Sequence, residues 1–83
     1  MYLLGTNVIS QFHKPQPDRG VLNWVGNQDE AELFISVVTV MEIEIGIKRL
    51  ERRDPEQARR LQRWLDQSVL KGFEGRIVPI DLD

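Results

Sequence analysis

The chain has 83 residues, of which 41% are hydrophobic and 29% charged, and its formal net charge is −2 at pH 7. This length fits one small domain, and the composition is that of an ordinary folded protein. The lack of cysteine excludes a disulfide framework, a thiol nucleophile and a cysteine-based zinc site. The single histidine, His13, excludes a histidine-rich metal centre.

Membrane association is not expected from the apolar pattern. The longest apolar stretch runs from Leu33 to Met41 and is interrupted by Ser36 and Thr39, whereas a membrane-spanning helix needs about 20 apolar residues. Residues 1–4 lack the basic segment and the long apolar run of a signal peptide. We therefore expect a cytoplasmic protein with no membrane partner.

The first half of the sequence predicts a strand followed by two helices. Residues 2–4 form a short apolar run that stops at a glycine, which is typical of a buried strand. Thr6 and Asn7 are both good N-cap residues for a helix that the prolines of residues 14–17 end. Asp18 then caps a second helix.

After a predicted strand over residues 32–36, the spacing of apolar residues fits either a strand or a helix. Residues 42–48 alternate between polar and apolar side chains, which by itself indicates a half-buried strand. Over a longer window the apolar residues follow one helical stripe, which favours a helix with Ser36 or Thr39 as its cap. The residues of this stripe are Val40, Ile43, Ile47 and Leu50.

The next segment predicts a helix and a final strand. Asp54 and Pro55 supply a cap and a first-turn proline, and Gln57 completes a capping-box arrangement. Gly72 is a plausible stop, and residues 76–80 read as a short strand. The apolar stripe of this helix consists of Leu61, Trp64, Leu65, Ser68 and Val69.

Strands separated by helices predict a parallel sheet and an α/β fold in a single domain over residues 1–83. In such folds, ligands bind beyond the carboxyl ends of the strands. This rule directs attention to Gly5, Thr6, Asn7 and Ser36, although helix capping explains Thr6 and Asn7 equally well.

Glu42 is the most informative acidic residue. It lies far round its predicted helix from the apolar stripe, next to Val38, Ile45 and Gly46, where it either binds a metal or is simply solvated. One carboxylate does not make a Mg²⁺ site, because this ion needs several oxygen ligands. The acidic residues after the last strand are Asp81 and Asp83.

Several motifs together resemble one family. Residues 1–10 (MYLLGTNVIS), 14–17 (KPQP), 36–47 (SVVTVMEIEIGI) and 72–79 (GFEGRIVP), with Trp24, resemble the PIN-domain toxins of the VapC type, ribonucleases of bacterial toxin–antitoxin modules. The resemblance covers the whole chain. It implies a PIN-like three-layer sandwich with a parallel sheet, here incomplete on its C-terminal side.

The resemblance also implies an activity and partners. VapC-type proteins cleave RNA with Mg²⁺ or Mn²⁺ held by four acidic residues, look like homodimers and are blocked by a VapB-type antitoxin. Glu42 matches the second of these acids and is the expected metal ligand, while Thr6 and Asn7 match the residues after the first. Arg49, Arg52 and Arg59 are the candidate RNA contacts in the basic segment.

Two departures point to an inactive chain. The position of the family's first aspartate is Gly5, which brings no ligand. The chain ends at Asp83, before the segment that carries the third and fourth acids in the family. We therefore expect neither useful metal binding nor catalysis by this chain alone, and an exposed sheet edge that needs a partner, a second copy or the missing half.

Two other functions remain open from the sequence. A degenerate homologue would only bind, either to an antitoxin or to an intact toxin, through apolar residues such as Val38, Met41 and Ile45. Alternatively, the basic segment between Lys48 and Arg63, which carries a charge of +4, belongs to a DNA-binding helix-turn-helix. The DNA contacts would then be Arg59, Arg60 and Arg63.

Overall fold

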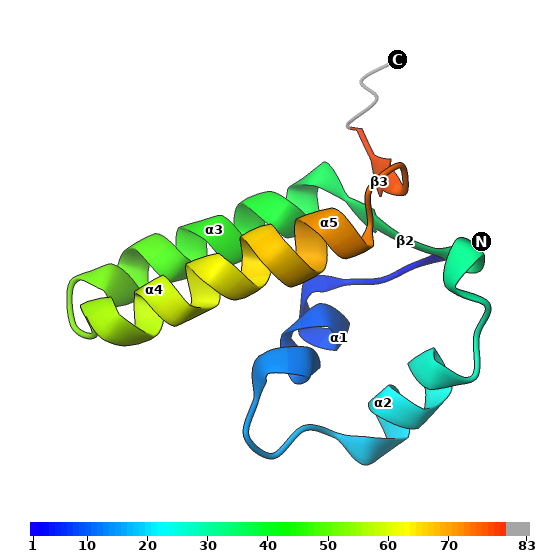
Figure 1. Cartoon of the computed structure of the whole chain (residues 1–83), viewed down its shortest axis with the longest axis horizontal. Coiled ribbons are helices and arrows are strands. Elements are labelled where there is room, and N and C mark those ends of the chain that lie inside the picture. Colours follow the sequence, from blue (N-terminus) through cyan, green and yellow to red (C-terminus); the bar gives the residue numbers. More distant parts are fainter. Residues whose placement is uncertain (80–83) are drawn as a thin grey trace.

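The computed structural model describes residues 1–79, in which short strands alternate with helices (Figure 1). In chain order the strands and α-helices are β1 (Tyr2–Leu3), α1 (Thr6–Ser10), α2 (Arg19–Gly26), β2 (Leu33–Ser36), α3 (Val37–Glu51), α4 (Pro55–Trp64), α5 (Leu70–Gly72) and β3 (Ile77–Val78). Short 3₁₀ turns follow α1 and precede β2.

The three strands form one parallel sheet in the order β1-β2-β3. Tyr2 pairs with Leu33 at one side of β2, and Ile35 pairs with Ile77 at the other. The central strand β2 is therefore the most enclosed, and Ile35 is fully buried. The predicted α/β class with a parallel sheet is confirmed, as is the order of strands and helices.

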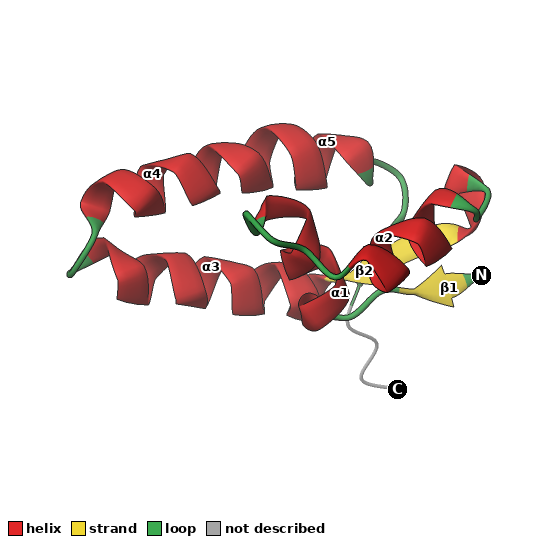
Figure 2. Cartoon of the chain, turned by 90° about the horizontal axis from the view of Figure 1, so that it is seen from below, coloured by secondary structure: helices red, strands yellow, loops and turns green. Residues whose placement is uncertain are grey.

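Helices α3 and α4 form a long hairpin whose arms lie side by side (Figures 1 and 2). Figure 2 shows the α4–α5 arm running above α3 in the opposite direction. The two helices of a DNA-binding helix-turn-helix cross at a steep angle instead. This packing does not match the helix-turn-helix alternative.

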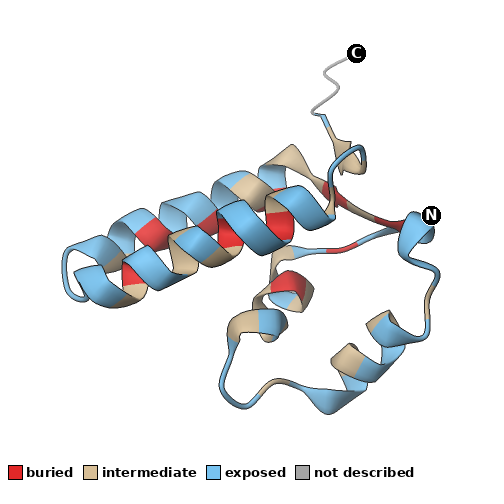
Figure 3. Ribbon diagram, in the orientation of Figure 1, coloured by how far each residue is buried: buried red, intermediate tan, exposed pale blue. Residues whose placement is uncertain are grey.

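The core lies where this hairpin meets the sheet and α1. Buried segments face one another on α3 and α4, and others lie on β2 and α1 (Figure 3). The helix predicted from the stripe on α3 is confirmed, since Ile43 and Ile47 are buried and Val40 and Leu50 pack against them. The buried apolar residues are Leu4, Ile9, Leu33, Ile35, Ile43, Ile47, Ala58, Leu65 and Val69.

Three of the predicted helix caps form, but the capping box predicted at one of them forms only in part. Asp18 accepts hydrogen bonds from the first turn of α2, and Ser36 accepts one from Thr39 at the start of α3. Asp54 accepts from Gln57 N at 3.1 Å, but the Gln57 side chain instead accepts hydrogen bonds from Arg60. The reciprocal half of the capping box is therefore wrong, because a neighbouring cation binds the glutamine oxygen.

The predicted helix after Asp54 is continuous but not uniform. A π-helical segment over Leu65–Val69 links α4 to α5. It carries two fully or nearly buried residues, Leu65 and Val69, while Ser68 from the predicted stripe is exposed. The strict three- and four-residue spacing therefore fails at Ser68. The helix stops at Gly72 as predicted.

The last strand is shorter than predicted. β3 spans Ile77–Val78, and the remainder of the predicted strand reaches Ile80, which lies outside the described residues. Among residues 1–79, no helix has both the length and the apolar character that crossing a membrane requires.

Candidate functional site

A hydrogen bond joins the start of α1 to the middle of α3. The hydroxyl of Thr6 donates to Glu42 Oε2 at 2.9 Å, across 36 positions of sequence. Thr6 is the first residue of α1 rather than its cap, so the prediction that Thr6 or Asn7 caps this helix is wrong. The cap is Gly5, and this leaves the Thr6 side chain available for Glu42.

Gly5 has no conformational reason to be glycine. Its φ of −80° and ψ of 170° are ordinary extended values, which any L-residue adopts. A Cβ built at Gly5 has no atom within 4 Å in the described part of the chain. A larger side chain therefore fits at this position, directly beside the Thr6–Glu42 contact.

Glu42 lies in an open groove between α1 and the α3–α4 hairpin. The groove residues that bear polar or ionisable groups come from four segments of the chain. They are Thr6, Ser10, His13, Glu42, Arg53 and Trp64. Gly46, one turn after Glu42, also lines the groove, where it leaves space beside the carboxylate. The site thus combines a carboxylate, hydroxyls, an imidazole and a guanidinium.

His13 forms the far end of this groove together with Trp64. The two rings meet edge to face, with their centroids 4.7 Å apart. Burial lowers the pKa of His13 below 6.5, the positive charge of Lys14 lowers it further, and a backbone hydrogen bond partly offsets both effects. The imidazole is therefore mostly neutral at pH 7.

The described residues do not by themselves fit a magnesium site. Within residues 1–79, no group of three or more histidine, cysteine, aspartate or glutamate side chains gathers to hold a metal. Glu42 offers one carboxylate, and the hydroxyl beside it already donates its proton to that carboxylate. Since Mg²⁺ takes several oxygen ligands, Glu42 alone does not make such a site.

The other predicted site residues do not converge on Glu42. Asn7 is exposed on α1, and its backbone carbonyl accepts a hydrogen bond from Gln11. The hydroxyl of Ser36 caps α3. Asp81 and Asp83, the acidic residues after the last strand, lie outside the described residues.

The three candidate RNA contacts lie in other hollows of the surface. Arg49 and Arg52 line one with Ile45, and Arg59 lines another between α3 and α4. The arginine that shares the groove with Glu42 is Arg53. Local charge density drew attention to the basic segment, but the sequence alone did not reveal which of its arginines faces the groove.

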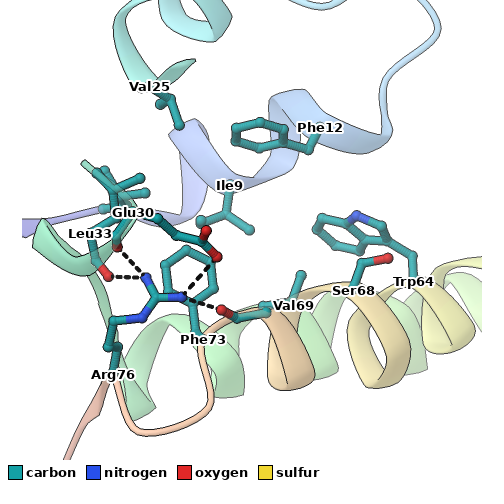
Figure 4. Close-up of a pocket in the computed structure, with 12 residues that line it drawn as sticks. Ile9, Phe12, Val25, Glu30, Leu33, Trp64, Ser68, Val69, Phe73 and Arg76 are labelled. Carbon is teal, nitrogen blue, oxygen red and sulfur yellow. Dashed lines mark hydrogen bonds and ion pairs between the residues drawn. The ribbon is translucent and has the colours of Figure 1, made fainter. Parts of the chain in front are cut away.

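A second hollow is mainly apolar and lies between α1, α2 and α5 (Figure 4). Arg76 closes one side of it: Nη1 donates to the carbonyls of Glu30 and Leu33, and Nη2 donates to the carbonyl of Gly72. Its guanidinium also lies 5.0 Å from the centroid of the Phe73 ring. No sequence pattern indicates this role, because the acceptors are backbone atoms and two of them lie more than 40 positions away in the chain.

Comparison with known proteins identifies the family. The PIN domain family model matches residues 2–81. A VapC ribonuclease, Y4jK from Sinorhizobium fredii, is 40% identical over 85 residues, which cover all of this chain and 58% of that protein. Ribonuclease VapC14 from Mycobacterium tuberculosis is 40% identical over 72 residues, which cover 87% of this chain and 70% of that protein.

A solved structure shows the same fold. The crystal structure of FitAcB from Neisseria gonorrhoeae superposes with a TM-score of 0.87 at 37% identity, over 98% of this chain and 57% of that chain. The chain therefore belongs to the PIN-domain family, among the VapC-type ribonuclease toxins. It spans 58% of the length of the VapC ribonuclease from S. fredii.

Proposed function

We propose that this chain is the Glu42-bearing part of a VapC-type ribonuclease toxin and that the 83-residue chain does not itself cleave RNA. Glu42 is one of the carboxylates that hold the catalytic Mg²⁺ or Mn²⁺ in the complete site. Bound there, the metal would polarise a phosphate oxygen and activate water. Thr6 holds the Glu42 carboxylate in place, and Gly5 leaves out one ligand.

The observation that carries this proposal is the contact between Thr6 and Glu42. It brings the end of β1, where the family has its first aspartate, beside the acidic position on α3. A carboxylate at residue 5 would stand next to that contact, and a Cβ at this position meets no atom of residues 1–79 within 4 Å. A metal ligand is therefore absent at residue 5 because glycine has no side chain. The extended backbone there would accept an aspartate.

The test restores that ligand. Mn²⁺ is expected to raise the melting temperature of Gly5→Asp, because two carboxylates bind the folded state and ligand binding stabilises it. The matched control Gly5→Ser and the double variant Gly5→Asp/Glu42→Gln are expected to show no such rise. Equal effects of Mn²⁺ on all three variants would contradict the pairing of residue 5 with Glu42.

A second candidate function is a non-catalytic binder, which pairs with an antitoxin or with an intact toxin. Three apolar residues on the outer face of α3 favour it: Val38, Met41 and Ile45 are 44%, 49% and 48% exposed. They stand three and four positions apart, so they form one stripe on the helix. Such a stripe suits a homodimer or a pair with another PIN-domain chain.

Partners follow from the same proposal. A VapB-type antitoxin would cover the groove and the apolar hollow of Figure 4, and RNA is the substrate of the complete enzyme. The chain then acts in the cytoplasm, where RNA is present.

Sedimentation velocity of the chain and of Met41→Glu tests whether two copies pair through the apolar stripe on α3. We expect the chain to form dimers that the charged variant disrupts. A monomer in both cases would contradict this pairing.

A further inference from the structure

The His13–Trp64 pair stands between two neighbouring hollows of the surface. One is the groove that holds Glu42, and the other lies beside Lys14 and Arg60. Both hollows are lined by His13, Leu61 and Trp64. Both residues are half-buried and so are partly accessible from the surface.

Positive charge flanks the aromatic pair on both sides. Arg53 lines the hollow that contains Glu42, while Lys14 and Arg60 line the other. Arg60 is held in place, because its Nε and Nη2 donate to Gln57 Oε1 at 3.1 and 2.7 Å. Accessible rings between cations form the arrangement in which single-stranded nucleic acids bind, with bases on the rings and phosphates on the cations.

We propose that His13 and Trp64 form a stacking subsite for an unpaired base of single-stranded RNA, with Arg53 and Arg60 neutralising the adjoining phosphates. This inference rests on the proposed function, since it places part of the RNA beside the Glu42 groove. The subsite would select for unpaired RNA, because a base inside a duplex has no free face to stack.

The chemistry of the site favours RNA over an acidic peptide. A peptide carboxylate would use the cations but leave the ring faces without a planar partner, whereas every base offers one. The lowered pKa of His13 also suits stacking, because a neutral imidazole does not need to stay hydrated.

The experiment measures binding of a fluorescent single-stranded RNA of mixed sequence to the full 83-residue chain and its variants. Trp64→Leu is expected to weaken binding by about tenfold, the loss typical of one stacked base, while Trp64→Phe retains most of it. The matched control is Trp24→Leu, which removes the other tryptophan from its contact with Tyr2, 5.0 Å between centroids. It is expected to bind as the unaltered chain does.

A second pair of variants tests the cations without touching the rings. Arg53→Gln is expected to lower the slope of log K against log salt by about 0.7, the value for one phosphate contact on a single strand. The matched control Arg19→Gln removes an exposed charge on α2 that lines neither hollow, and it is expected to leave the slope unchanged. Circular dichroism spectra establish that each variant is folded.

Four results would overturn the subsite. The first is that folded Trp64→Leu and Trp64→Phe both bind RNA as tightly as the unaltered chain. The second is that inorganic polyphosphate of equal charge competes fully with the RNA. The third is no RNA binding, and the fourth is a preference for a polyglutamate peptide over RNA. None of these decides the proposed function, which is tested separately by Mn²⁺ binding to Gly5→Asp.

Discussion

Two charged side chains lie at opposite ends of the parallel sheet and serve different purposes. Arg76 lies just before β3, and its guanidinium donates to three backbone carbonyls and to the Glu30 carboxylate. Glu42 lies on the helix that follows β2, is exposed, and among residues 1–79 accepts its side-chain hydrogen bond from Thr6. The donors of Arg76 are mostly used, whereas Glu42 keeps most of its acceptor capacity.

The difference separates a residue that holds the fold together from one that is available for a ligand. The Arg76 side chain is 17% exposed, and its partners come from the turn before β2 and from the end of α5. Removing it would leave three carbonyls without this donor, of which the Leu33 carbonyl is partly buried. Removing the Glu42 side chain would leave only the Thr6 hydroxyl without its acceptor, which water replaces.

The largest expected effect is on Arg76. We expect Arg76→Ala to lower the free energy of unfolding by about 2–4 kcal/mol, because charge-assisted hydrogen bonds to carbonyls are lost together. Urea unfolding measures this loss. Arg76→Lys is the matched control and should recover part of the stability, since an ammonium reaches fewer of these acceptors. If Arg76→Ala unfolds with an unchanged free energy, Arg76 does not stabilise the fold and its contrast with Glu42 is wrong.

An intermediate effect is expected at residue 5. We expect Gly5→Ser to raise the free energy of unfolding by about 0.5–1 kcal/mol, because it restricts the unfolded chain and caps α1. Gly5→Asp should gain less without metal, since its carboxylate stands near Glu42. Thermal unfolding of both variants measures this difference. A destabilised Gly5→Ser would mean that residue 5 is more constrained than its extended backbone shows.

A smaller effect is expected at the hydrogen bond itself. Thr6→Val should cost no more than about 1 kcal/mol, because the bond lies at the surface and water competes for it. Glu42→Gln should change stability still less, since an amide oxygen also accepts from Thr6. Urea unfolding of both variants beside Arg76→Ala sharpens the comparison. A cost for Glu42→Gln as large as that for Arg76→Ala would make Glu42 a structural residue.

The smallest expected effect is a pH dependence from His13. Its folded-state pKa lies below the 6.5 of the unfolded chain. As pH falls below 6.5, the unfolded state takes up a proton first, so stability declines with acidification and is independent of His13 above that range. Thermal melts between pH 7 and 5 should show a shallower slope for His13→Gln. If the melting temperature falls equally with pH in the unaltered chain and in His13→Gln, His13 is not the source of the pH dependence.

Local patterns predicted the features that depend on neighbours in the chain. The apolar stripe on α3, the Ser36 and Asp18 caps and the strand–helix order all follow from short-range spacing. The errors arose where a side chain binds a partner other than the one that the local pattern predicts. Thr6 was predicted as a cap but binds Glu42, 36 positions away, and the Gln57 oxygen accepts from Arg60 instead of closing a capping box.

The sequence predicted only some of the residues that line the groove. Glu42 stood out because a carboxylate lay off the apolar stripe and matched a family motif. His13 and Trp64 did not, because their contact links positions 51 residues apart and neither residue belongs to a motif. Spacing along the chain carries no information on such pairs, which depend on how the α3–α4 hairpin lies against α1.

The most direct measurement is RNA cleavage by the purified 83-residue chain in Mg²⁺ or Mn²⁺, with Glu42→Gln beside it. Because Gly5 supplies no ligand and no group of three or more metal-binding side chains gathers within residues 1–79, we expect no cleavage above the background of Glu42→Gln. Divalent-dependent cleavage that chelation stops and Glu42→Gln abolishes would show that the chain builds a working site, and would contradict the proposed inactivity.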